Sequence, residues 1–170
     1  MKVYADTSFL VQLLTQEPGT KGAVADYRRL GRPRLFLLPL HHLEITNAIH
    51  QRVFRQRHTL PSWEHSAIKR ERDTSLALLE KYIARRAFIE ISHDLETAFE
   101  LARRLSAKYA DRLGCRGIDA LHVALAIELD CKVFLTADRS QGALAREEGL
   151  TDAISVHESF EVNGTNGARQ

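Results

Sequence analysis

The sequence predicts an α/β fold with a central parallel sheet of about five short strands flanked by helices. Short apolar segments alternate with longer helical segments along the chain, which is typical of proteins that form a parallel sheet. The strand-like segments are 3–5, 35–38, 88–91, 133–136 and 154–156. The helical segments are 8–15, 21–30, 41–57, 63–85, 95–111, 118–129 and 141–148.

Breaks in the chain define the elements of the first half. A short β-prone run ends at Asp6, and an apolar-periodic helix then continues to Leu14. Gly31-Arg32-Pro33 interrupts the chain before the second strand, and Leu60-Pro61-Ser62 marks the start of the fourth helix. These signals place each of the first helices after a strand or a turn.

The second half contains the most apolar helix. From Ala120 to Ile127 only His122 is polar, so this helix is apolar nearly all round and should be buried. His122 is interpreted as a hydrogen-bonded core residue in preference to a zinc ligand. The segment 132–136 then reads as a core strand, with Asp138 just past its end.

Length and composition indicate one globular domain. The 170 residues contain no internal repeat and no dividing linker, so we expect a single domain over 1–160 and a disordered Gly- and Asn-rich tail over 161–170. No apolar run reaches the length of a membrane span, and no signal-peptide pattern is present. Two cysteines are too few for a disulfide framework, which favours a reducing, cytoplasmic setting.

Four acidic residues stand at strand–helix junctions. Asp6 and Asp138 each follow a strand, Asp119 enters the buried helix, and Glu44 falls in the first turns of the third helix. Ligands of open parallel sheets bind outside the carboxyl ends of the strands, so all four can reach one cleft. Each also has a structural alternative: Asp6 and Asp138 as helix N-caps, Asp119 as a partner of Arg116, and Glu44 as a surface carboxylate.

This arrangement suits a divalent cation. Mg²⁺ and Mn²⁺ prefer oxygen ligands, and crowded carboxylates repel one another until a cation neutralises them. Bound metal activates water and stabilises charge on a scissile phosphate. Thr7, Ser8 and Thr136 can supply supporting hydroxyl groups, with an equal alternative as cap and strand residues. The sequence contains no phosphate-binding loop, no H-E-x-x-H, no C-x-x-C and no G-x-S-x-G motif.

A basic region lies beside the predicted cleft. Between Arg52 and Arg86, nine Lys or Arg residues face four Asp or Glu residues, whereas the rest of the chain has fifteen against eighteen. On a regular helix, Glu44, Ala48, Gln51 and Arg55 share one stripe that leads from the acids to this region. A polyanion held over bound metal would use such a track, and Arg52, Arg55 and Arg57 are the expected contacts with a nucleic-acid backbone. A solvated helix pair laced with ion pairs is the alternative.

Several motifs resemble those of the PIN-domain ribonucleases, and more narrowly the VapC-type toxins of toxin–antitoxin pairs. They are V-Y-A-D-T-S-F-L at the start, an acid on the third helix, I-D-A-L-H-V-A-L-A, and V-F-L-T-A-D-R-S. The resemblance implies a three-layer α/β fold, Mg²⁺- or Mn²⁺-dependent endoribonuclease activity, frequent homodimers and a small antitoxin that blocks the cleft. Its acidic positions fall on Asp6, Glu44, Asp119 and Asp138, and its hydroxyl falls on Thr136.

The resemblance leaves open which biological role the nuclease has. One departure from the family concerns the packing of the last helix: an aromatic residue often follows the last acid by about three residues, whereas this chain has Ser140-Gln141-Gly142 there. Arg116 and Arg139, beside two acids, are placed to contact RNA or acidic antitoxin groups. The alternatives are a housekeeping RNA-processing or DNA-cleaving nuclease without an antitoxin, and a non-catalytic RNA-binding domain. Retention of all four acids argues against the last.

Overall fold

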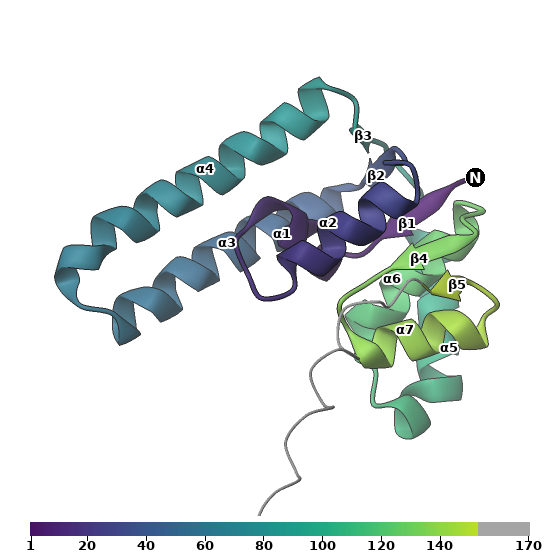
Figure 1. The fold of residues 1–170 in the computed structure, drawn as a ribbon. Helices are drawn as coiled ribbons and strands as arrows, with labels where there is room; N and C mark the ends of the chain where they lie inside the picture. Colours follow the sequence, from purple (N-terminus) through teal and green to yellow (C-terminus); the bar gives the residue numbers. More distant parts are fainter. Residues whose placement is uncertain (153–170) are drawn as a thin grey trace, which may run out of the picture.

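The computed structural model describes residues 1–152 and contains a parallel sheet of five short strands (Figure 1). The strand order is β3-β2-β1-β4-β5, and each pair of neighbours is parallel. The strands are β1 (Val3–Ala5), β2 (Leu35–Leu37), β3 (Phe88–Glu90), β4 (Val133–Leu135) and β5 (Thr151–Asp152). The predicted α/β class is confirmed, as are the first four strands. The strand expected at 154–156 and the tail 161–170 lie outside the described residues.

Seven helices connect these strands within the described part of the chain. Their ends differ from the sequence-based expectation by at most two residues, and a short 3₁₀ turn (Ser62–Glu64) leads into the fourth. The helices are α1 (Thr7–Leu14), α2 (Thr20–Arg29), α3 (Pro39–Thr59), α4 (His65–Ala84), α5 (Leu95–Leu113), α6 (Gly117–Glu128) and α7 (Arg139–Glu147). None of them, within residues 1–152, is long and apolar enough to cross a membrane.

The sheet separates two apolar layers because successive strand residues point to opposite faces. Val3 and Ala5 of β1 pack in a cluster with residues of α1 to α4. Tyr4, between them, packs in a second cluster with residues of α5, α6 and α7. The result is a three-layer arrangement in which the buried α6 lies against the sheet.

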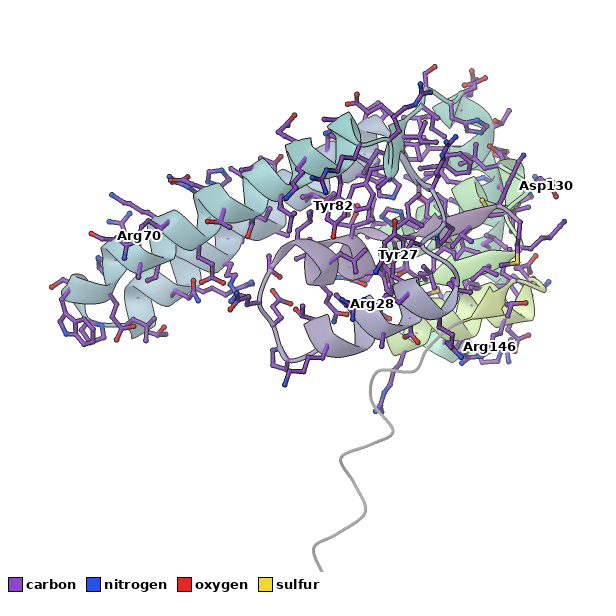
Figure 2. All side chains as sticks on the ribbon, turned by 45° about the horizontal axis from the view of Figure 1, so that its top comes forward. Tyr27, Arg28, Arg70, Tyr82, Asp130 and Arg146 are labelled. Atoms are coloured by element: carbon purple, nitrogen blue, oxygen red, sulfur yellow. The ribbon has the colours of Figure 1, made fainter. Side chains whose placement is uncertain are left out.

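The helices α3 and α4 form a long antiparallel hairpin, here called the α3–α4 arm, that extends away from the sheet (Figure 1). Most of the predicted basic region lies on this arm. Arg70 projects from α4 in its distal half, away from the body of the protein (Figure 2). Phe54 and Trp63, near the tip, are 59% and 77% exposed. The arm therefore combines basic and exposed aromatic side chains.

Candidate active site

A pocket of about 400 Å³ brings three of the four predicted acids together. Asp6 enters it from the carboxyl end of β1, Glu44 from the second turn of α3 and Asp119 from the first turn of α6. Asp138 stands at the start of α7 and is not among the residues that line the pocket. The pocket lies where parallel-sheet proteins bind ligands.

Asp6 is buried, with 4% of the residue exposed. Its Oδ1 accepts the backbone N–H of Phe9 at 2.9 Å, so it also caps α1, as the structural alternative predicted. The Ser8 hydroxyl lies 2.8 Å from both carboxylate oxygens, and the Thr136 hydroxyl lies 3.0 Å from Oδ2. Burial raises the pKa of the Asp6 carboxyl despite these bonds and the nearby His122. Without a cation, the ionised form of this buried carboxylate is therefore costly in free energy, and a bound cation would lower that cost.

Glu44 is held by two donors on one of its oxygens. Thr7 donates its hydroxyl proton to Oε2 at 2.6 Å, and His122 Nε2 lies 2.7 Å from the same atom. Burial alone would raise the pKa of Glu44, but the bonds from His122 and Thr7 outweigh it, so this pKa is lowered. Glu44 is consequently an ionised carboxylate in the metal-free protein, and its negative charge is available to a cation.

A second buried histidine fixes α3 relative to β1. The backbone N–H of Leu38 donates to Nδ1 of His41 at 3.0 Å, so the proton of the neutral ring is on Nε2. That proton points to the carbonyl oxygen of Ala5, 3.1 Å away. Burial lowers the pKa of His41 to about 3, which keeps the ring neutral. His41 thus ties the start of α3 to the end of β1, and this sets Glu44 beside Asp6.

Asp119 is paired with Arg116 at the entrance of α6. Its Oδ2 accepts the backbone N–H of Arg116 at 2.8 Å, and the guanidinium reaches both carboxylate oxygens at 3.1 Å. This is the structural alternative considered for Asp119, and it shows that the buried carboxylate already has a cationic partner. Because 73% of the Arg116 side chain is exposed, the guanidinium has room to move when a metal ion or phosphate approaches.

The hydroxyl of Thr136 connects the two strand-end acids. It lies 3.0 Å from Asp6 Oδ2 and 2.7 Å from Gln141 Oε1, and with one proton it donates to one of these at a time. It also accepts the backbone N–H of Asp138, whose carboxylate caps α7 through the N–H of Gln141. Gln141 was not singled out from the sequence, because no spacing rule relates it to Asp6.

The donor set of the pocket fits a hard divalent cation. Asp6, Glu44 and Asp119 offer carboxylate oxygens only, which Mg²⁺ and Mn²⁺ prefer. Within residues 1–152, no three His, Cys, Asp or Glu side chains are close enough to form a complete cage. Mg²⁺ commonly uses one or two carboxylates and completes its shell with water and substrate oxygens. The side chains present are therefore sufficient for such an ion.

The predicted RNA contacts occupy different environments. Arg55 lines the pocket together with Ala48, so the stripe from Glu44 does lead along α3. Arg57 is exposed near the end of α3, and Arg139 is exposed at the start of α7. Arg52 instead pairs with two acids at 2.8 Å, Glu17 before α2 and Glu71 of α4. Its guanidinium joins the middle of the α3–α4 arm to the loop before α2.

Comparison with known proteins identifies the family. The sequence model of the PIN domain matches residues 3–147, which is most of the chain. The protein therefore belongs to the PIN domain family, whose members are typically nucleases that generally use divalent metal ions.

One solved structure supports the same fold. The chain is similar to the crystal structure of PAE2754 from Pyrobaculum aerophilum, with a TM-score of 0.52 and 17% sequence identity over 89% of each chain. At this identity the similarity concerns the fold alone. No curated protein matches the sequence.

Proposed function

We propose that this protein is a Mg²⁺- or Mn²⁺-dependent endoribonuclease that acts as the toxin of a toxin–antitoxin pair. The observation that carries the nuclease proposal is the convergence of Asp6, Glu44 and Asp119 in one pocket at the carboxyl edge of the sheet. One or two of these carboxylates would hold the ion together with water and phosphate oxygens, and the bound ion would supply an activated water and charge stabilisation on the phosphate. Asp138, at the start of α7, would complete the acidic set from outside the pocket lining.

Cleavage of defined RNAs by the purified protein tests the nuclease proposal. We expect cleavage in Mn²⁺ or Mg²⁺, loss of cleavage in chelator and recovery when excess metal is restored, because the carboxylates need a cation to receive phosphate. Duplex and single-stranded DNA of the same sequence serve as parallel substrates. Cleavage that persists in chelator would contradict the proposal, and cleavage of DNA alone would replace RNA as the substrate.

Expression in a bacterial host tests the toxin proposal. The wild-type chain should slow growth, and Asp119→Asn should remove this effect. Co-expression of the small protein encoded by the neighbouring upstream gene should restore growth of cells that carry the wild-type chain. An antitoxin could inhibit the enzyme by inserting an arginine among the carboxylates of the pocket. The Arg116–Asp119 pair supports this proposal, since it shows a guanidinium bound to one of these carboxylates. Harmless expression of folded, RNA-cleaving wild type would leave an RNA-processing nuclease. A homodimer, which the family resemblance implies, is also proposed, and light scattering tests it separately.

The basic side of α3 is proposed to guide the RNA backbone. Replacing Arg55 and Arg57 together by Ala should weaken RNA binding and reduce the slope of log affinity against log salt by about 1–2. Arg52→Ala is the matched contrast. Because Arg52 pairs with Glu17 and Glu71, its loss should lower the free energy of unfolding by about 1–2 kcal/mol.

These measurements separate RNA contact from structural support. Fluorescence anisotropy over a salt series reports the slope, and urea unfolding reports stability. An unchanged salt slope in the double variant would show that these arginines form a solvated helix face.

A further inference from the structure

A buried polar chain connects Glu44 to the core of the molecule. Nε2 of His122 lies 2.7 Å from Oε2 of Glu44, and Nδ1 of His122 lies 2.8 Å from the Tyr4 hydroxyl. Tyr4 belongs to β1, His122 to α6 and Glu44 to α3, so the chain joins three separate elements. Tyr4 and His122 are 0% and 3% exposed. Protein groups, not bulk water, therefore satisfy the imidazole.

The partners of His122 select one tautomer of the ring. A carboxylate only accepts hydrogen bonds, so the nitrogen that faces Glu44 must carry a proton. In a neutral ring Nδ1 is then an acceptor, and the Tyr4 hydroxyl supplies the matching proton. The ring also packs against Tyr4 and His41, with centroid distances of 5.9 and 5.2 Å. Its orientation is thus fixed by both hydrogen bonds and packing.

This chain determines which oxygen of Glu44 is available. Oε2 receives bonds from both His122 and Thr7. No hydrogen bond from residues 1–152 to Oε1 accompanies them, and Glu44 lines the pocket that also contains Asp6. A carboxylate held at one oxygen presents the other with little rotational freedom. Such fixing by neighbouring hydrogen bonds commonly contributes to the affinity of metal sites.

We propose that His122, held in a single tautomer by Tyr4, is the positioning residue of Glu44 and sets its free oxygen for a divalent cation. This inference rests on the proposed metal-dependent function, and it adds His122, which lines the pocket beside Glu44, and Tyr4, which lies in the core behind it. His122 acts through Glu44 alone and touches neither metal nor substrate. The buried helix α6 thus contributes two groups to the site, Asp119 directly and His122 through Glu44.

Two substitutions at position 122 separate the roles of the two ring nitrogens. The amide of glutamine can place a donor near the Nε2 position, whereas the shorter asparagine places its amide near Nδ1 and loses contact with Glu44. His122→Asn should therefore weaken Mn²⁺ binding by roughly 10–100-fold, as expected for lost support of a metal ligand. His122→Gln should restore most of that affinity. Tyr4→Phe should weaken binding by less than His122→Asn, because the carboxylate still favours a proton on Nε2.

The measurement is calorimetric titration of each purified variant with Mn²⁺ alone, after circular dichroism shows a native melt. In a Glu44→Gln background, His122→Asn should produce no further loss, since its effect passes through that carboxylate. A loss of equal size in both backgrounds would show a general structural role and overturn the proposal. Should His122→Asn fail to fold, His122→Gln and Tyr4→Phe provide the comparison, and weaker binding in the glutamine variant than in the phenylalanine variant would overturn it.

The outcome is distinguishable from failure of the proposed function. Wild type that binds Mn²⁺ with the expected dependence on His122 but cleaves no RNA would refute the nuclease and leave the positioning role. Cleavage by wild type with unchanged Mn²⁺ affinity in folded His122→Asn would refute the positioning role and leave the nuclease. Wild type that binds no Mn²⁺ at millimolar concentration would refute both.

Discussion

Asp6→Asn should reduce metal-dependent RNA cleavage by more than about 100-fold, since loss of groups that only support a metal ligand already costs roughly 10–100-fold. The fold should survive, because the amide oxygen of asparagine can still accept the Phe9 N–H and cap α1. Ser8 and Thr136 can turn their hydroxyl groups to accept from the new amide. The measurement is the single-turnover cleavage rate in saturating Mn²⁺.

The same substitution should stabilise the metal-free protein at neutral pH. Burial raises the pKa of Asp6 above its usual 3.8, so the folded state holds this proton more tightly than the unfolded state. Stability contributed by this group is therefore lost as pH rises from about 3.8 through the raised pKa. Asparagine carries no charge and avoids the loss. In chelator, the stability difference between variant and wild type should be larger at pH 8 than at pH 4.

Asp94→Asn is the matched control for this prediction. Asp94 caps α5 through the N–H of Glu96, outside the pocket, so the same exchange occurs at a helix start without touching the acids. It should leave cleavage unchanged. Full activity of Asp6→Asn would exclude Asp6 as a metal ligand, and a stability gain equal at both pH values would exclude its buried charge as the cause.

Phe134→Ala should lower the free energy of unfolding by about 3–5 kcal/mol, the usual cost of removing a fully buried phenylalanine. Phe134 lies in β4, is 0% exposed and stacks on Tyr4 with ring centroids 5.5 Å apart. The cavity would open beside Tyr4, which donates to His122. We therefore expect weaker Mn²⁺ binding as well, measured beside the urea midpoint.

Phe99→Ala supplies the comparison for that core substitution. Phe99 is 57% exposed on α5, so its truncation should change stability by no more than about 0.5 kcal/mol. Equal effects of the two substitutions would mean that Phe134 is not packed in the core as described.

The confirmed predictions are those in which a local pattern determines the structure. The apolar run of α6 and the strand ending at Asp6 are such patterns, and three of the four acids meet in one pocket because parallel strands finish at one edge of the sheet. Contacts between residues far apart in the sequence could not be predicted. Arg52 meets Glu17 and Glu71, which are 35 and 19 residues away, and nothing in the local pattern of α3 indicates either contact.

His122, the polar residue of the otherwise apolar helix α6, was the only sign in the sequence of the hydrogen bonds that support Glu44. His122 was expected to be hydrogen-bonded, which the structure confirms, but Tyr4 lies 118 residues away and Glu44 lies 78 residues away. Asp138 shows that a correct local pattern does not determine where a side chain points. Its position after a strand matches that of Asp6, yet its side chain caps α7 beyond the pocket lining, because the turn between Thr136 and α7 determines where it points.

The central place of β1 has a consequence for synthesis of the protein on the ribosome. β1 is made before the other described strands, yet it pairs with β4, and the N–H of Asp6 donates to the carbonyl of Leu135 at 2.9 Å. At about 5–20 residues per second, this partner emerges on the order of ten seconds after Asp6. A nascent chain that ends between Asp119 and β4 thus carries Asp6, Glu44 and Asp119 without the strand that fixes the first of them. Interrupted translation should therefore release inert fragments, and the pocket should assemble only in copies that include β4.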